Sequence, residues 1–288
     1  MGRPSQRTSS RGVFDYIRRV SEAKAHVVGV FGRAADLYDE VEPRHFSHFG
    51  RALVERADLA DGVEVLDVAT GKGAVLFPAA ERALRVVGID LAEPMIHALR
   101  KAIARGGVPN ATATVMDAEN LEFADSSFDV VLCGFAVFMF PEPARALAEF
   151  HRVLRPSGIV GLTIFGKGDE RWQPVREMLF ARAPAPSSPE RPPQMQFRNA
   201  HDLRAALEAG AFSDVRTEEE VFDATYTDAD QWLSWAWSHG YREILEQLTE
   251  SELEDFKAEV YPRMEITREA DSRLHNRLTA INGYGVKS

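Results

Sequence analysis

The chain has 288 residues, with 34 Lys and Arg against 44 Asp and Glu, so its formal net charge is −10. This length allows one large domain or two small ones, and the acidic balance argues against a nucleic-acid partner. The single cysteine excludes an internal disulfide and a cysteine-ligated metal centre and favours the cytoplasm, and no apolar run approaches the ~20 residues that span a membrane.

The first 60 residues lack the strand pattern of the middle of the chain. Residues 1–12 are basic and polar without an apolar core, which predicts a disordered tail and not a secretory signal. Residues 13–60 have helical character and are expected to form an N-terminal helical cover.

Strands and helices then alternate from residue 63 to residue 166, the pattern of a parallel sheet with crossover helices. A core built in this way is expected to be a doubly wound α/β fold. The predicted strands span residues 63–68, 85–90, 111–116, 128–133 and 159–165, and the predicted helices span residues 93–105 and 143–154.

The alternation loosens beyond residue 166. The proline-rich stretch 181–193 predicts a loop, and Asn199 is expected to cap a helix over 199–210. Two further strands are expected, at 215–224 and 278–286. Between them, residues 226–272 look helical and acidic.

The negative charge is concentrated near the last part of the chain. Residues 217–260 hold thirteen carboxylates against Arg242 and Lys257, a net charge of −11, so the remainder of the chain is close to neutral. We interpret this segment as the solvated outer face of a cap. A polyanionic acceptor is not expected to enter past it.

A glycine-bearing turn follows the first predicted strand in Leu-Asp-Val-Ala-Thr-Gly-Lys-Gly-Ala, residues 66–74. Such a turn lets a ligand approach the backbone closely, with helix N–H groups pointing at it. Asp90 ends the second strand about 20 residues later, where comparable folds place a carboxylate on ribose hydroxyls. The dinucleotide pattern G-x-G-x-x-G fails at Leu76, and a P-loop fails at Leu66 and Gly73.

Five motifs in order resemble the class I S-adenosylmethionine-dependent methyltransferases, particularly their ubiquinone/menaquinone-type small-molecule branch. They are residues 65–73, 86–96, 117–121, 127–135 and 152–158. The resemblance implies a Rossmann-like, doubly wound, seven-stranded sheet whose last strand is antiparallel, with an N-terminal helical cover and a helical cap. The expected core is 61–225 with 273–288, including a linker and cap segment at 167–198, and the expected acidic cap over the acceptor pocket is 226–272.

The resemblance also implies the cofactor, S-adenosyl-L-methionine, with S-adenosyl-L-homocysteine as product. In this family the turn after the first strand holds the methionine part, Asp90 accepts from the ribose hydroxyls, and Asp117 binds the adenine amino group. Ala69 departs from the glycine of many members, and Pro78 is expected to delay or kink the first crossover helix. The implied cofactor-binding residues are Tyr38, Asp67, Ala69, Thr70, Gly71, Gly73, Asp90, Leu91, Met95, Asp117, Ala118, Cys133, Gly134 and Phe135.

Residues 232–241 carry three of the four tryptophans. On a helix, Trp232, Trp235 and His239 share a face. These aromatic residues are expected either to pack inside the domain or to form a flat apolar wall for a hydrophobic acceptor. Phe138 would stand on the opposite wall, so the predicted substrate pocket contains Phe138, Trp232 and Trp235.

Methyl transfer from a sulfonium is an in-line displacement in which alignment supplies much of the rate. A general base is needed only when the acceptor must lose a proton, and the candidates are His45, His239, Tyr241 and Glu170. His45 and His48 are three residues apart, but two histidines alone do not define a metal site, and none is predicted.

The predicted function is methyl transfer to an oxygen, nitrogen or carbon of a hydrophobic small molecule. Abundant Ala and Arg suggest bacterial specialised metabolism, and a monomer or homodimer is expected. One alternative is a cyclase or binding protein that shares the fold without transferring methyl groups. A second is RNA or protein methylation, and no basic surface interleaved with aromatics supports RNA.

Overall fold

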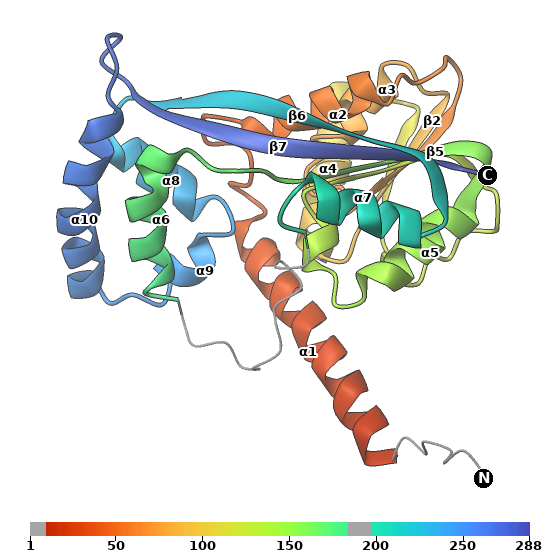
Figure 1. Ribbon diagram of the computed structural model, residues 1–288, viewed down its shortest axis with the longest axis horizontal. Helices are drawn as coiled ribbons and strands as arrows, with labels where there is room; N and C mark the ends of the chain where they lie inside the picture. Colours follow the sequence, from red (N-terminus) through yellow and green to blue (C-terminus); the bar gives the residue numbers. More distant parts are fainter. Residues whose placement is uncertain (1–9, 184–196) are drawn as a thin grey trace.

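Seven strands form one sheet in the order β3-β2-β1-β4-β5-β7-β6 (Figure 1). The computed structural model describes residues 10–183 and 197–288. The first five strands are parallel, and β7 runs antiparallel to both of its neighbours, as expected. The strands are β1 (Glu64–Val68), β2 (Arg85–Asp90), β3 (Ala111–Val115), β4 (Phe128–Gly134), β5 (Leu154–Phe165), β6 (Phe212–Tyr226) and β7 (Leu274–Lys287).

Helices cover both faces of the sheet because alternate strand residues point in opposite directions. In β4, Val131 and Cys133 belong to a core that includes α5 and α7. Their neighbours Val130 and Leu132 belong to a second core with α3 and α4. The strand is therefore buried on both faces, as its continuous apolar sequence predicts.

The observed helix boundaries differ from the predicted ones at α1 and agree with the prediction at the start of α7. Helix α1 includes residues 10–12, which were expected in the disordered tail, and the remainder of that predicted tail, residues 1–9, lies outside the described residues. Asn199 caps α7 by accepting a hydrogen bond from the backbone N–H of Asp202, as predicted. Helix α3 contains Pro78 and has only five residues. The helices are α1 (Ser10–Ala34), α2 (His45–Arg56), α3 (Leu76–Ala80), α4 (Glu93–Gly106), α5 (Pro143–Val153), α6 (Gln173–Phe180), α7 (Ala200–Ala209), α8 (Ala229–Trp237), α9 (Arg242–Leu245) and α10 (Glu250–Met264).

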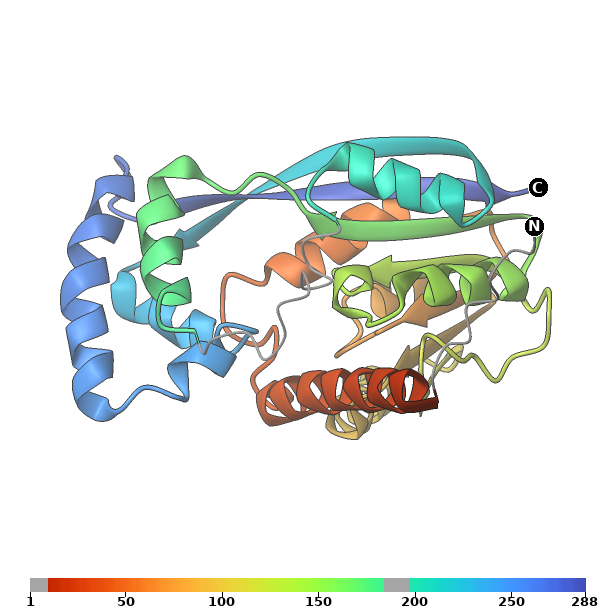
Figure 2. The same cartoon turned by 60° about the horizontal axis from the view of Figure 1, so that its bottom comes forward.

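Strands β6 and β7 are longer than predicted, with 15 and 14 residues. They extend past the other strands toward α6, α8, α9 and α10, which gather at the far end of the molecule (Figures 1 and 2). Trp172, Tyr226, Trp232 and Phe256 are buried together in that cap. Helix α6, which lies in the segment 167–198 expected as a linker and cap segment, packs there as well. The proline-rich loop expected at 181–193 lies outside the described residues from residue 184 onward.

The acidic segment is not only a solvated face. Glu220 of β6 pairs with Arg56 and His48 of α2, and two carboxylates of the cap pair with α1. The latter pairs are His26 with Glu243, at 2.8 Å, and Arg33 with Glu246. Part of the negative charge thus connects β6 and the cap to the N-terminal helices, while the carboxylates of α10 remain exposed. Within the described residues, no helix is both long and apolar enough to cross a membrane.

Gly50 allows α2 to lie directly against the turn after β1. A Cβ at this position would overlap the backbone carbonyl of Ala74. We expect Gly50→Ala to lower the free energy of unfolding by about 2–3 kcal/mol, since it overpacks a buried contact with backbone. Urea denaturation followed by circular dichroism measures the change. Gly106→Ala, at a helix position with ordinary contacts, is the control, and equal stability of the two variants would contradict this account.

Candidate active site

The carboxyl ends of β1 and β2 bring two carboxylates to the glycine-bearing turn. Asp67 accepts a hydrogen bond from the Thr70 hydroxyl at 2.5 Å. Asp90 accepts from the backbone N–H groups of Gly71, at 3.0 Å, and Ala92, at 2.9 Å. Asp90 therefore ties the turn after β1 to the start of the segment after β2, which fixes the shape of this edge of the sheet.

Two adjoining cavities open at this edge. The larger is about 320 Å³ and lies along the turn, and the smaller is about 100 Å³ and lies beside the segment after β2. Five residues line both cavities, so they are parts of one continuous site. The shared residues are Tyr38, Ala69, Gly71, Gly134 and Phe135.

The residues predicted for cofactor binding gather here, with one exception. Asp67, Thr70 and Gly73 line the larger cavity together with the five shared residues. The smaller cavity is lined by Asp90, Leu91, Met95, Asp117 and Ala118. The exception is Cys133, whose side chain is fully buried in the sheet core. Burial raises the pKa of its thiol, so it is neutral and inert.

Burial also raises the pKa of the two carboxylates at the turn. The pKa of Asp67 rises to about 7, because burial outweighs the Thr70 hydrogen bond and the nearby Asp90 adds to the shift. The pKa of Asp90 is raised by burial as well, although backbone N–H donors oppose the shift. One oxygen of Asp67, Oδ1, is buried without a hydrogen-bond partner among the described residues. The turn therefore presents acceptors suited to a cationic or hydrogen-bond-donating ligand.

Three non-glycine residues of the larger cavity have left-handed backbone conformations. They are Asp39, Ala69 and Phe135, each with φ of 53°. This region is uncommon for residues with a Cβ and costs roughly 1–3 kcal/mol where the side chain is bulky. Ala69 stands where many family members have glycine, so the departure noted in the sequence coincides with strained backbone at the site.

The segment between α1 and α2 covers the cavities. The Tyr38 ring stacks on Phe46 with centroids 5.3 Å apart, and it lies above Gly71, where a Cβ would come within 3.6 Å of it. Lys72 of the turn pairs with Glu40 at 2.6 Å. The turn after β1 and the segment over it are therefore held together by stacking and by an ion pair.

Helix α1 closes the smaller cavity through Lys24. Its Nζ lies 2.6 Å from Asp117 Oδ2 and 2.5 Å from Glu119 Oε2. Burial by itself would lower the pKa of Lys24, but the hydrogen bonds with both carboxylates outweigh it and raise the pKa. Asp117, expected at the adenine amino group, thus also holds α1.

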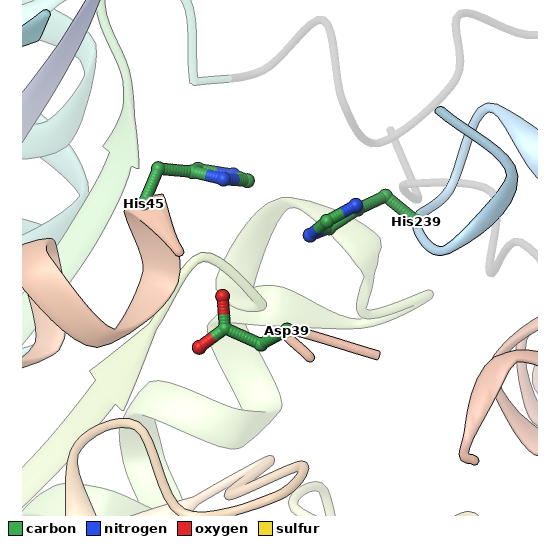
Figure 3. A group of neighbouring side chains, drawn as sticks. All are labelled: Asp39, His45 and His239. Atoms are coloured by element: carbon green, nitrogen blue, oxygen red, sulfur yellow. The ribbon is translucent and has the colours of Figure 1, made fainter. Parts of the chain in front are cut away.

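Two of the predicted base candidates come together at the cover. His45, the first residue of α2, and His239, after α8, are buried with ring centroids 5.0 Å apart. Asp39 lies beside both (Figure 3). Burial and the neighbouring His239 lower the pKa of His45 well below its usual value, and burial lowers the pKa of His239 to about 4, so both rings are neutral at pH 7. His48, the predicted neighbour of His45, instead faces Glu220.

Other predicted residues lie elsewhere. Glu170 is exposed and pairs with Lys167 at 2.5 Å, so it is not placed to act as a base. Burial raises the pKa of Tyr241, whose ring packs on Trp235. Trp232 packs against Trp172 in the cap core rather than forming a pocket wall. Neither cavity, as far as the described residues define it, is lined by Trp232, Trp235 or Phe138.

Sequence reasoning missed several lining residues. Lys24 and Glu119 line the smaller cavity, and Asp39, Phe46 and Thr163 line the larger one. Asp39 and Glu119 are immediate neighbours of predicted residues, so the motifs could have indicated them. No local signal indicates Lys24 or Thr163, because their positions depend on how α1 and β5 pack.

Comparison with known proteins identifies the family. Residues 66–162 match the family model described as a methyltransferase domain. The chain is 35% identical to nocamycin O-methyltransferase of Saccharothrix syringae over 228 residues, which cover 74% of this chain and 81% of that relative. It is 32% identical to aklanonic acid methyltransferase DauC of Streptomyces sp. (strain C5) over 210 residues, which cover 68% of this chain and 96% of the relative.

Solved structures agree with the fold. The YcgJ protein of Bacillus subtilis superposes with a TM-score of 0.56 at 19% identity, covering 83% of this chain and 98% of that one. Phosphoethanolamine N-methyltransferase 2 of Haemonchus contortus, in complex with S-adenosyl-L-methionine, superposes with a TM-score of 0.52 at 19% identity, covering 83% of this chain and 52% of that one. The chain belongs to the class I S-adenosylmethionine-dependent methyltransferases.

Replacing Lys24 tests how α1 is held over the smaller cavity. We expect Lys24→Met to lower the free energy of unfolding by about 2 kcal/mol, because Glu119 is buried and would lose its cation. Trypsin should also cleave α1 faster in this variant. Glu22→Gln, which removes an exposed ion pair with Arg18 on the same helix, should change neither measurement. Unchanged stability and cleavage in Lys24→Met would show that the ion pairs do not hold α1.

Proposed function

We propose that this enzyme transfers the methyl group of S-adenosylmethionine to an oxygen of a hydrophobic small molecule of specialised metabolism. The observation that carries the proposal is the larger cavity, which adjoins the smaller cavity and has aromatic walls from Tyr38, Phe46, Phe77 and Phe135. Such walls suit a hydrophobic acceptor. Transfer to oxygen is supported by the name of the relative from Saccharothrix syringae, an O-methyltransferase.

The residues around both cavities fit S-adenosylmethionine. When bound, this cofactor supplies a methyl group that is already activated on a sulfonium. We assign Asp90 to the ribose hydroxyls, with Leu91, Met95 and Ala118 beside the adenine and Asp117 toward its amino group. The methionine part is assigned to the turn after β1 and to Gly134 and Phe135. The unpartnered Oδ1 of the buried Asp67 supports this fit, because it offers an acceptor for an ammonium group.

The protein contributes placement and exclusion of water. Tyr38 and Phe46 stack over the turn and cover the site, so an acceptor is held between them and the strand ends. Alignment of this kind supplies a large share of the rate in a displacement. Thr163 and Asp39 offer polar atoms on the wall of the larger cavity.

The acceptor oxygen that we favour is acidic. One relative is named for an acid, aklanonic acid, and an oxygen that is ionised at neutral pH needs no general base. Of the four base candidates, His45 and His239 lie nearest to the larger cavity, since both rings pack on Phe46, which lines it. We assign neither of them as a base.

The relatives bear on the alternative function and on the class of acceptor. The non-transferring alternative, a cyclase or binding protein, is not favoured, since the two relatives described above are methyltransferases. A small-molecule acceptor agrees with those relatives. A cytoplasmic location, a monomeric or homodimeric state and the lack of a nucleic-acid partner stay predictions.

Turnover with matched acceptors tests the proposed reaction. Polycyclic aromatic compounds that differ only in carrying a carboxyl, a hydroxyl or an amino group are offered with S-adenosylmethionine. We expect S-adenosylhomocysteine to form with the oxygen nucleophiles, fastest with the acidic ones, and mass spectrometry of the product should show one added CH₂ unit on oxygen. Methylation of the amine alone would contradict the proposal. Cofactor binding without turnover on any of the three would favour the non-transferring alternative.

The raised pKa of Asp67 predicts that cofactor affinity depends on pH. A cationic ligand favours the carboxylate form and lowers its pKa, so the affinity for S-adenosylmethionine should rise by about tenfold between pH 5.5 and pH 7.5. It should level off above the pKa of about 7 in the free protein. Calorimetric titration at several pH values measures this.

Two variants separate Asp67 from other titrating groups. Asp67→Asn should weaken binding and remove most of the pH dependence. Asp61→Asn, at an exposed carboxylate with 92% of its side chain accessible, should change neither the cofactor affinity nor its pH dependence. A pH dependence that persists in Asp67→Asn would refute the role given to Asp67.

A further inference from the structure

Three ligand-type side chains converge beside the larger cavity, from segments far apart in the chain. Asp39 follows α1, His45 begins α2, and His239 follows α8 in the cap. A ligand atom from each lies within 4.8 Å of those from the other two. Figure 3 shows the two imidazole rings pointing toward each other, with the carboxylate of Asp39 below them.

Each of the three side chains has a buried polar atom without a hydrogen-bond partner among the described residues. Asp39 Oδ1, His45 Nδ1 and His239 Nε2 are all buried without a hydrogen bond to any described residue. The two histidines are only 2% and 4% exposed. Leaving one buried polar atom unpaired costs roughly 1–3 kcal/mol, and buried polar atoms are normally satisfied. Unpaired buried atoms on three side chains that converge in this way indicate that a ligand belongs there.

The second polar atoms of His239 and Asp39 are already hydrogen-bonded in a way that prepares a metal site. His239 Nδ1 lies 2.7 Å from the carbonyl oxygen of Trp235. Because a carbonyl only accepts, Nδ1 carries the proton and Nε2 keeps its lone pair toward the cluster. Asp39 Oδ2 accepts from the Ser47 hydroxyl at 2.5 Å, which leaves Oδ1 free. Metal-ligating histidines and carboxylates are typically oriented by second hydrogen bonds of this kind.

We propose that Asp39, His45 and His239 bind a divalent transition-metal ion of the Zn²⁺ type. Two imidazole nitrogens and one carboxylate oxygen are ligands that Zn²⁺ accepts at about 2.0–2.2 Å, so a modest contraction of the cluster would complete three positions. The set is wrong for Mg²⁺ or Ca²⁺, which take oxygen ligands. A fourth position would remain for water or an oxygen of the acceptor.

The ion would connect two parts of the protein that are far apart in the sequence. It would join the N-terminal segment, through Asp39 and His45, to the cap, through His239. Tyr38, which lines both cavities, precedes Asp39, and the ring of Phe46 lies 4.0 Å from that of His45. The ion would therefore hold the cap against the segment that covers the methyl-transfer site. This inference concerns binding and closure, and it does not depend on which acceptor is methylated.

Metal titration of the untagged, full-length protein tests the proposal without cofactor or acceptor. After treatment with EDTA and desalting, calorimetry with ZnCl₂ should show one ion bound per chain. Saturating Zn²⁺ should raise the thermal midpoint by about 5 °C, since an ion that binds only the folded state stabilises it. MgCl₂ at the same concentration should not. The absence of a one-to-one Zn²⁺ site would overturn the proposal and would leave the methyl-transfer function untouched.

Substitutions locate the site. His45→Ala and His239→Ala should each weaken Zn²⁺ binding by at least about 100-fold, because a ligand is lost. Two control variants should bind as the parent does: His48→Ala, one turn further along α2, and His275→Ala, which removes a histidine flanked by Asp223 and Asp271. Binding that survives in both ligand variants, or that is lost in His275→Ala, would overturn the assignment.

A measurement on the unaltered protein covers the case in which the variants fold poorly. X-ray absorption of the one-to-one Zn²⁺ complex should show a shell of nitrogen and oxygen with the multiple-scattering signature of two imidazoles. Replacing Zn²⁺ by Co²⁺ should give the visible absorption of a tetrahedral site. A spectrum without imidazole scattering would place the ion elsewhere and refute the proposal.

Discussion

The turn between β1 and α3 and the segment that covers it have to fit together, and the rest of the site depends on that contact. Three interactions define it: Gly50 of α2 lies against the carbonyl of Ala74, Tyr38 lies over Gly71, and Lys72 pairs with Glu40. At Gly50 the two layers are so close that a Cβ would overlap backbone, whereas Tyr38 is in ordinary contact with the turn and Lys72 adds an ion pair. Both cavities are bounded by this contact. Cofactor binding and closure of the cover therefore depend on the same residues.

Charge gives the enzyme a second set of connections. The acidic segment 217–260 contains partners for α1 and α2, as in the pairs of Glu220 with Arg56 and of Glu246 with Arg33. Individual surface ion pairs contribute little to stability. These pairs, however, connect elements that lie far apart in the sequence. They hold the N-terminal helices against β6 and the cap, so that the aromatic residues and the cluster of Asp39, His45 and His239 meet near the methyl-transfer site.

The parts of the fold that followed from sequence are those set by local patterns. Alternating apolar strands and helices predicted the sheet, and the glycine-bearing turn with Asp90 predicted its binding edge, because parallel strands end together. Strand and helix ends were less well predicted. The long β6 and β7 are stabilised by pairing with each other, which a local pattern does not reveal. The early start of α1 at Ser10 was likewise missed.

The sequence by itself determined the class of fold and, through the resemblance, the cofactor, and all but one of the residues predicted to bind it line the two cavities, because they lie in contiguous motifs whose spacing reflects the backbone geometry of the binding edge. Tertiary structure alone decided which residues cover the site. It placed Trp232 in the cap core, buried Cys133 in the sheet and paired His45 with His239 instead of His48. These outcomes depend on how α1, α2 and the cap pack against one another, and long-range packing of this kind leaves no periodic signal along the chain.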